Sequence, residues 1–486
     1  MSATPTALAD PSTVEGAAQP PALYTLFFTE MWERFSYYGM RALLVLYLVK
    51  AAGYGRADAL ALYATYTGLV YLSPVVGGYL SDRFLGYRKS ILTGGIIMML
   101  GHFAMAVPSL LHYALGLLVI GVGLFKPNIA SLLGTFYHER DPRRDGGFTI
   151  FYMGVNLGAF LAPLVAGTLG ERVGWDWGFA SAGVGMGFGL LQFWLGSGRL
   201  GTQGFPPGQT SLTRRDWAQM AAIVAAAVVF LTAALQVWPL IAPLWDAVPL
   251  WLRVAAPLVA LVWLLRDVHS RDGPVIMQQV LAILLMCSFV IVFWMGFEQA
   301  GGTMNLFADN LTDRHLLGWE IPASYFQAIY PLVILMMGPV FSVLWSRLDT
   351  SRYALSTPAK MGIGMIILGL GFVLLYVAQT RAEAFGPVGP FWLVGVYFLH
   401  TVGELCLSPI GLSMVTKLAP IRLAALMMGM WYLANGIANF LAGRLESLLA
   451  SSGVPIYGFL VASSIGAGML LLAISPLLRR WMHGRA

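Results

Sequence analysis

Charge is scarce in this sequence. Of its 486 residues only 11% are Asp, Glu, Lys or Arg, whereas 58% are hydrophobic, and the mean hydropathy is +0.72. A soluble globular chain carries about 25% charged residues, so too few remain here to cover a surface that faces water. The composition excludes a soluble enzyme, a nucleic-acid-binding protein and a disordered scaffold.

Cysteines are few, and phosphate-binding loops are absent. The two cysteines, Cys287 and Cys406, lie in apolar runs, which excludes a disulfide framework and a cysteine-based metal site. The sequence contains no GxxxxGK loop followed by Ser or Thr, so ATP is not the expected energy source. We expect neither a metal ion nor an organic cofactor.

Long apolar runs, in contrast, are frequent. Fourteen stretches are long enough to cross a bilayer as helices, which takes about 20 residues each. Gly and Pro within them are tolerated in lipid, because neighbouring helices satisfy the freed backbone groups. The alternating segments of about ten residues that a membrane barrel needs are absent, so the sequence predicts an all-α polytopic membrane protein. The stretches are 24–50, 57–80, 89–109, 111–136, 146–170, 176–198, 216–238, 246–266, 275–300, 320–346, 358–380, 388–417, 423–447 and 454–479.

One change in composition divides the chain. Residues 201–215 form a linker rich in Gly, Pro, Gln and Thr, and the following run 221–237 is almost entirely Ala, Val and Leu. Such helices suit positions that face lipid, and without the two spans after the linker six spans remain on each side, as in repeat-built transporters. The predicted units are a flexible cytoplasmic tail at 1–22, a six-helix bundle at 23–199, a linker with two extra helices at 200–272, a second six-helix bundle at 273–480 and a cytoplasmic tail at 481–486.

The basic residues are distributed unevenly between the two ends of the spans. With the N-terminus placed in the cytoplasm, 19 of the 29 Lys and Arg residues fall on the cytoplasmic side and seven on the opposite side, while Arg34, Arg41 and Lys126 lie inside spans. Because Lys and Arg are enriched on the cytoplasmic side, both termini are expected there. This distribution accounts for the net charge of +6 without a nucleic-acid partner.

Charged residues inside spans are the candidates for function, because each costs about 2.5–3.5 kcal/mol at the centre of a membrane helix. The first span contains the run EMWERFSYYGMR, in which two acids, two arginines and two tyrosines recur at helical spacing and share one face. Mutual neutralisation of acids and arginines is the structural alternative, although apolar residues would hold helices together at less cost. The members of this cluster are Glu30, Glu33, Arg34, Tyr37, Tyr38 and Arg41.

Two polar residues stand out in the fourth and fifth spans. Lys126 lies well inside its span, before Pro127, so a cation that faces a cavity is favoured over one that reaches the interface. Asn156 lies between Gly154 and Gly158, a spacing also typical of close helix packing. Packing and ligand binding remain equal alternatives for this amide.

Two acids lie in spans of the second half. Glu298 and Glu404 have no basic residue near them in the sequence, whereas the first half offers Arg34, Arg41 and Lys126. The simplest pairing of charges is therefore across the two halves, around a central cavity that is cationic on one side and anionic on the other. A plain hydrogen bond between helices is the alternative for each acid.

This arrangement of charge suits a zwitterion. Arginine binds carboxylates in bidentate fashion, a glutamate accepts an ammonium group, and aromatic walls accept varied side chains. Carboxylates in a low-dielectric site can also exchange protons, and one proton that moves through about 100 mV releases about 2.3 kcal/mol. Protons are therefore the expected coupling ion. The candidate walls are Tyr37, Tyr38, Tyr71, Trp294 and Trp431.

Several motifs resemble those of the proton-dependent oligopeptide transporter family of the major facilitator superfamily. The pattern ExxERFxYYG at Glu30 is the most specific, and the resemblance extends over residues 24–480. Further family-like motifs are GYLSDRFLGYRK at Gly78, GLFKPN at Gly123, Phe151 and Tyr152 with Asn156 and Gly158, FEQ at Phe297, GTMNLF at Gly302 and GELCLSP at Gly403.

The resemblance implies a fold and an activity. The fold is that of two six-helix bundles plus the two extra helices typical of bacterial members, or 14 transmembrane helices. The activity is proton-coupled import of di- and tripeptides by alternating access, in the bacterial inner membrane and by a monomer. Peptide-like drugs are further candidate ligands, and no enzymatic activity is expected.

The resemblance also implies roles for single residues. Proton coupling would involve Glu30, Glu33, Arg34 and Glu298. The substrate would be bound by Arg34, Tyr37, Tyr38, Arg41, Tyr71, Lys126, Asn156, Trp294, Glu298, Glu404, Ser408 and Trp431. Asp82 and Arg83 would belong to a gate and would not contact ligand.

The sequence departs from the family pattern at two positions, and other functions stay open. Ala64 stands where mammalian members have His, and Tyr330 where bacterial members usually have Asn. Proton handling then rests on carboxylates, and one amide contact with substrate is in doubt.

The alternatives are transport of another anion or a drug-like molecule, and an ion channel or membrane enzyme. A channel would need rings of like charge and an enzyme a nucleophile–base or metal constellation, and the spans contain neither pattern.

Overall fold

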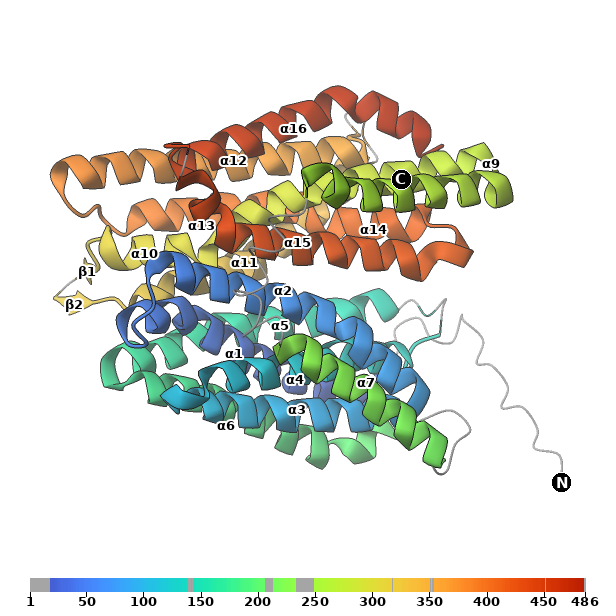
Figure 1. Ribbon diagram of the computed structural model, residues 1–486, viewed down its shortest axis with the longest axis horizontal. Helices are drawn as coiled ribbons and strands as arrows, with labels where there is room; N and C mark the ends of the chain where they lie inside the picture. The colour runs from blue at the N-terminus through green and yellow to red at the C-terminus, as the bar shows by residue number, and fades with distance from the viewer. Residues whose placement is uncertain are drawn as a thin grey trace.

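The computed structural model describes residues 18–138, 141, 143–205, 213–232, 249–316, 318–349, 351, 354–450 and 452–484. In this part of the chain long helices run side by side in two groups, with blue to teal helices in one and yellow to red helices in the other (Figure 1). The two groups are the two helix bundles predicted from the sequence.

The first bundle contains six helices. Its centre is α1, which packs against α5 and α6, while α4 packs against α2 and α3. Most side chains of α1 are buried, including those of Glu30, Glu33, Arg34 and Arg41. The helices are α1 (Pro21–Lys50), α2 (Arg56–Leu80), α3 (Gly86–Met105), α4 (Leu111–Gly134), α5 (Arg144–Thr168) and α6 (Trp175–Leu195).

The second bundle begins within α9 and ends with α16. Short elements join its first two spans, namely the 3-10 turn Glu298–Gly301, α10, an antiparallel pair of two-residue strands and the 3-10 turn Ala323–Ala328. The elements are α9 (Leu250–Phe297), α10 (Thr303–Asn310), β1 (His315–Leu316), β2 (Trp319–Glu320), α11 (Ile329–Asp349), α12 (Thr357–Phe385), α13 (Phe391–Leu405), α14 (Ser408–Leu418), α15 (Ala424–Ala450) and α16 (Ile456–Trp481).

Two further helical segments lie outside the bundles. One is α7 (Arg214–Thr232) and the other is the first part of α9, which is separated from the second part at Gly273. Gly273 has φ 86°, a left-handed conformation that glycine adopts without steric cost. Large apolar side chains on both segments are exposed, for example Phe230 at 58% and Trp263 at 69%, which agrees with the predicted positions facing lipid.

The predicted spans agree with the helices of the described residues. Each of the fourteen stretches overlaps a helical segment, although 233–248, the end of the seventh and the start of the eighth, lies outside the described residues. By length and hydropathy alone, nine helical stretches of the described part can cross a membrane. Prolines occur inside several of them, such as Pro74 and Pro127, as lipid-embedded helices allow.

The predicted terminal tails are only partly described. Residues 1–17 lie outside the described residues, and α1 begins at Pro21, two residues before the predicted limit. At the other end α16 stops at Trp481.

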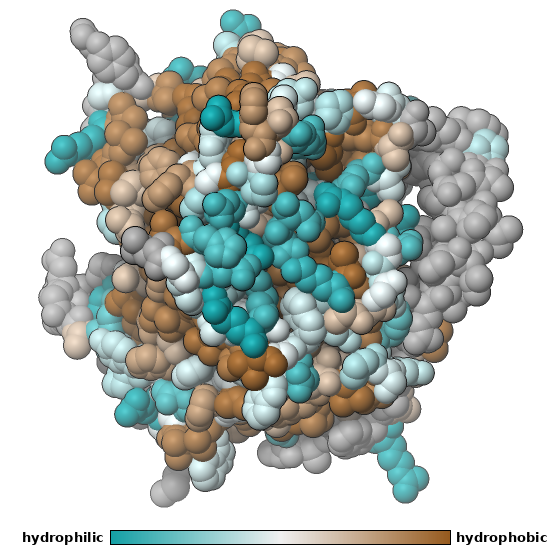
Figure 2. Space-filling view, turned by 90° about the vertical axis from the view of Figure 1, so that its left-hand side faces the viewer, coloured by the Kyte–Doolittle hydropathy of each residue, from teal (hydrophilic) through white to brown (hydrophobic). Residues whose placement is uncertain are grey.

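The face that carries β1 and β2, turned toward the viewer in Figure 2, has hydrophilic residues at its centre and apolar residues around them.

Candidate functional site

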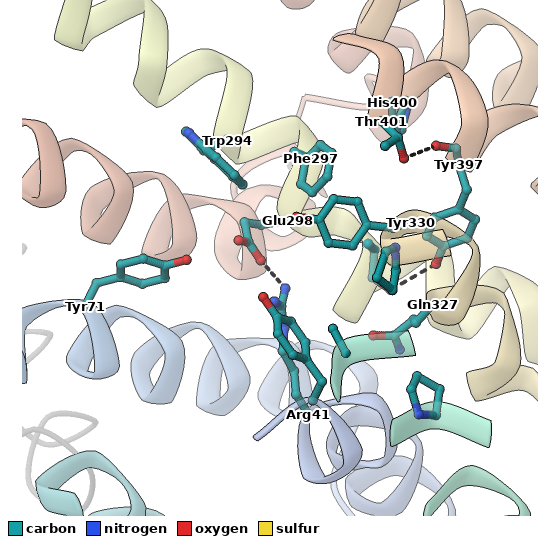
Figure 3. A pocket seen from close by; sticks show the side chains of 15 residues that line it. Arg41, Tyr71, Trp294, Phe297, Glu298, Gln327, Tyr330, Tyr397, His400 and Thr401 are labelled. Carbon is teal, nitrogen blue, oxygen red and sulfur yellow. Dashed lines mark hydrogen bonds and ion pairs between the residues drawn. The ribbon is translucent and has the colours of Figure 1, made fainter. Parts of the chain in front are cut away.

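A small cavity of about 70 Å³ lies between the two bundles. Both bundles contribute to its wall, and Figure 3 shows Arg41 and Tyr71 on one side facing Trp294, Glu298 and Tyr330 on the other. Ligand pockets for small molecules usually measure about 300–1,000 Å³. In this conformation the cavity therefore has room for a few water molecules and none for a dipeptide.

Arg41 and Glu298 join the bundles at this cavity. The guanidinium of Arg41 on α1 contacts a carboxylate oxygen of Glu298, and its Nε donates a hydrogen bond of 2.7 Å to the hydroxyl of Tyr63. The two charged side chains are 11% and 3% exposed. This contact confirms the predicted pairing of charges across the halves for these two residues.

The charge cluster of α1 is closed on itself. Arg34 Nε lies 3.0 Å from Glu30 Oε1 and 2.5 Å from Glu33 Oε2, and all three side chains are buried. For Arg34 the prediction of a partner in the other half is wrong, because two acids on its own helix are within reach. Glu30 Oε2 and Arg34 Nη2 have no hydrogen-bond partner in the described part of the chain, so both remain available to a proton or a ligand.

Lys126 has an aromatic neighbour. Its Nζ lies 4.8 Å from the centre of the Tyr71 ring, and Tyr71 itself lines the cavity. No carboxylate of the described residues lies within ion-pair distance of Lys126, although the charges of Glu30, Glu33 and Glu298 act on it. Lys126 is thus a cation beside an aromatic face, with carboxylates only at longer range.

Glu404 contacts the residue that departs from the family pattern. Tyr330 donates a hydrogen bond of 3.4 Å to Glu404 Oε1, whereas Oε2 has no partner among the described residues. His400, one turn before Glu404, lines the cavity and packs on Phe372 with ring centres 4.5 Å apart. Within the second half, Glu404 is therefore held by a phenol and not by a cation of the first half.

Four further predicted substrate contacts are not part of the cavity wall. Asn156 is 2% exposed and donates to the carbonyl of Tyr152 on its own helix. Tyr37 packs against Arg34, and Trp431 lies against Gly411. Ser408 is the first residue of α14, with a buried hydroxyl that lacks a partner in the described chain. The structure does not bring these four residues to the cavity in this conformation.

The predicted gate residues lie at the end of α2. Asp82 and Arg83 belong to the short π-helical turn Ser81–Leu85, and both are exposed. Neither forms an ion pair with any described residue, and Arg83 lies over the ring of Phe84 at 5.6 Å. Their part in a gate stays a prediction.

The bundles are linked at one end of the molecule. Lys50 Nζ lies 2.5 Å from Asp309 Oδ1, and Arg56 Nε lies 2.7 Å from Glu446 Oε1. The carboxylate of Glu171 accepts hydrogen bonds of 2.8 and 2.9 Å from two backbone N–H groups of the turn before α11. Among the described residues, every hydrogen bond and ion pair between the bundles lies in the half of the molecule that contains Lys50, the C-terminal end of α1. The cavity is therefore closed at this end of the molecule.

Sequence reasoning missed several residues of the site. Tyr63, Gln327, Phe297, Tyr397 and Thr401 contact Arg41 or line the cavity. The signal for Tyr63 was its spacing of two helical turns from Tyr71, and Tyr397 and Thr401 precede Glu404 at helical spacing. Asn305, in the motif GTMNLF, donates a hydrogen bond of 2.8 Å to the carbonyl of Ala42, a backbone partner that no side-chain pattern reveals.

Comparison with known proteins identifies the family. A family model described as POT family matches residues 88–460. The chain belongs to the POT family. It is 36% identical to the peptide transporter YePEPT of Yersinia enterocolitica, with 96% of this chain and 95% of that protein covered. Identity to the di-/tripeptide transporter of Lactococcus lactis subsp. lactis is 34%, with 95% and 96% covered.

Solved structures agree with the sequence comparison. A crystal structure of a variant of peptide transporter POT in complex with alafosfalin has a TM-score of 0.83 and 35% identity, covering 98% of this chain and all of the other. A POT family transporter in complex with 5-aminolevulinic acid also has a TM-score of 0.83, at 31% identity and with 95% and 97% covered. The chain is thus a multi-spanning membrane transporter with the major facilitator fold, and not an enzyme.

Proposed function

We propose that this POT family protein is a proton-coupled symporter that imports di- and tripeptides by alternating access. The observation that carries the proposal is the contact between Arg41 of the first bundle and Glu298 of the second, at a cavity that both bundles line. A buried charge pair between moving halves can couple opening to the charge of a ligand or a proton, because losing one partner leaves the other uncompensated.

The chemistry of the site supports a zwitterionic substrate. Lys126 and the arginines offer cations, and Glu298 and Glu404 offer carboxylates on the opposite side. A peptide carries a carboxylate and an ammonium group at opposite ends, so its charges match this arrangement. The names and bound ligands of the relatives, which are peptides or amino-acid-like molecules, support the same class.

The buried cluster of Glu30, Glu33 and Arg34 is proposed to take up the coupling proton. The ion pairs within α1 and the unpaired oxygen of Glu30 leave a site where protonation of one acid would free Arg34 for the peptide carboxylate. Glu298 would be the second protonation site, because its protonation would release Arg41 and allow the closed end to open. No resident cofactor is invoked.

The proposed setting is the bacterial inner membrane, with both termini in the cytoplasm and a functional monomer. Basic residues are in excess at the helix ends that lie on the same side as the two termini, which supports this orientation. The closed end of the described structure would then face outward, and the cavity would open toward the cytoplasm. A reporter fused to the C-terminus tests the topology.

Liposome uptake tests the function. The purified protein, reconstituted without ATP, is expected to accumulate labelled dialanine when the outside is acidified, and a protonophore is expected to abolish accumulation. Absence of uptake by folded protein would contradict the proposal. If dipeptides fail to stabilise the protein thermally while another anion or a drug-like solute does, the substrate class is a different one.

A further inference from the structure

A second, larger cavity lies far from the substrate site, where α11 and α16 end and α12 begins. Its volume is about 410 Å³. Three basic side chains from three helices line it, and no Asp or Glu of the described residues does. These are Lys360 of α12, Lys417 of α14 and Arg479 of α16, and Trp345 of α11 lines the same cavity.

Two of the three cations have no neutralising partner among the described residues. Lys417 and Arg479 form no ion pair with any described residue. Lys360 is only 6% exposed, and its Nζ lies 4.9 Å from the centre of the Trp345 ring. Because Lys417 and Arg479 are two unpaired cations on the wall of one cavity, an anion between them would lower the electrostatic energy.

A hydrogen-bond donor in the cavity wall also lacks an acceptor. The indole Nε1 of Trp345 is buried and has no partner in the described part of the chain. A buried donor left without a partner costs about 1–3 kcal/mol, and an anionic oxygen in the cavity is the kind of acceptor it requires. The hydroxyl groups of Thr357 and Ser413 line the same space and can donate to the same anion, whereas the hydroxyl of Ser356 is hydrogen-bonded to that of Ser475 at 2.7 Å.

Part of the cavity wall is apolar. Leu355, Ile410 and Met414 belong to its wall, and a wider depression of about 650 Å³ shares Arg479 and adds Arg480. A small soluble anion would use only the basic residues. A molecule with a charged head and apolar chains would use both the basic and the apolar residues.

We propose that this cavity binds the phosphate headgroup of an anionic phospholipid. The inference rests on the proposed topology, which puts the cavity at the cytoplasmic leaflet, where anionic lipids and basic pockets between helices meet. Lys417 and Arg479 would hold the phosphate, with Trp345 as a further donor, and Ile410 and Met414 would contact the start of an acyl chain. The lipid would tie together the ends of four helices of the second bundle.

Thermal unfolding of the full chain in detergent tests the proposal. The probes are dihexanoylphosphatidylglycerol, dihexanoylphosphatidylcholine at equal concentration, and sodium phosphate at matched ionic strength. Phosphatidylglycerol is expected to raise Tm more than phosphatidylcholine does. In K417Q/R479Q the half-saturating concentration of phosphatidylglycerol should rise about tenfold or more.

Two control variants separate this site from general charge effects. R199Q/R266Q removes two exposed arginines outside the cavity and should respond to phosphatidylglycerol as the unmodified chain does, and K417R/R479K should keep the binding. Equal stabilisation by both lipids, or equal loss in R199Q/R266Q, would overturn the proposal. If sodium phosphate alone gives the full stabilisation, the site binds a soluble anion and the proposal of a lipid headgroup is overturned. Because Tm is measured without peptide or a pH gradient, failure of peptide uptake would leave this result intact.

Discussion

The hydroxyl of Tyr330 on α11 donates a hydrogen bond to Glu404 on α13 across 3.4 Å, at the cavity between the bundles. The ring of Tyr330 also packs edge-on against Phe297, with ring centres 5.1 Å apart. The phenol therefore donates to one carboxylate oxygen of Glu404 and narrows the cavity at which we propose that the peptide binds. This residue is the clearest candidate for a determinant of substrate size.

Shortening Tyr330 should widen the preference for side chains. In Y330N we expect the KM for a dipeptide with a large side chain, such as Phe-Ala, to fall about tenfold relative to that for Ala-Ala, because overpacking costs about 1–3 kcal/mol. Y330F keeps the ring and removes only the hydroxyl, so its size preference should match that of the unmodified chain. Competition assays with a dipeptide panel measure both, and an unchanged ranking in Y330N would refute the size argument.

The acids of α1 should separate coupling from binding. E30Q, E33Q and R34A are each expected to abolish accumulation driven by external acid, because Arg34 and both acids form one buried ion-pair cluster. In the two acid variants, counterflow of labelled peptide without a pH gradient should survive. The comparison of acid-driven uptake with counterflow in one liposome preparation measures this, and acid-driven accumulation retained in all three variants contradicts the assignment.

The pair between Arg41 and Glu298 should be far more sensitive than the pair between Lys50 and Asp309. R41Q leaves a buried carboxylate without its partner, which typically costs about 3–5 kcal/mol. K50Q removes a side chain that is 42% exposed and leaves Asp309 beside Arg314 at 3.3 Å, so it should cost about 0–1 kcal/mol. R41Q/E298Q should regain much of the stability lost in R41Q, because no lone charge remains. Thermal unfolding measures all three, and additive losses in the double variant would contradict direct pairing.

Lys126 should recognise the carboxylate end of a peptide. We expect K126A to weaken binding of free dipeptides at least about tenfold, since a charge-assisted bond contributes about 1.5–3 kcal/mol. The same variant should have much less effect on dipeptides whose carboxylate is amidated. Peptide-dependent thermal shifts give both affinities. Equal losses for the two ligand types would show that Lys126 serves only to balance the charges of Glu30, Glu33 and Glu298.

Close packing of α5 on α1 should limit substitution at Gly158. A Cβ at this position would overlap the carbonyl oxygen of Met31 and lie 3.0 Å from Cβ of Arg34, so G158A should displace the charge cluster and destabilise the protein by about 1–3 kcal/mol. G116A is the matched control, because a Cβ at Gly116 of α4 meets nothing within 4 Å. Thermal unfolding should show a loss in G158A alone, accompanied by weaker acid-driven uptake.

Much of the fold could be predicted from the sequence because hydropathy alone determines which segments can cross a bilayer. The pairing of Arg41 with Glu298 was also predictable, since a lone acid in a span needs a cation from elsewhere. The pairing of Arg34 was predicted wrongly, although the spacing of four residues from Glu30 allows an ion pair within one helix. Proximity along the helix outweighed the expected partner in the other bundle.

Other features depend on tertiary packing that side-chain patterns do not encode. Asn305 bonds to the backbone of Ala42, and any residue could have supplied that carbonyl. Trp431 was expected at the cavity, but its ring lies against Gly411, where the absence of a side chain leaves room for it. The size of the cavity depends on how closely the bundles approach, which is a property of the conformation.

The two segments outside the bundles are attached to different halves of the molecule. Residues of α7 line a groove with α2 and α4, whereas Asp267 and Asp272 in the first part of α9 lie 2.9 and 2.6 Å from the guanidinium of Arg422 in the second half. When the two halves move relative to each other, the distance between α7 and the first part of α9 must change. A pair of spectroscopic labels at the lipid-facing positions Phe230 and Trp263 would report the distance between the two segments during the conformational change. Neither label would lie in the proposed substrate cavity.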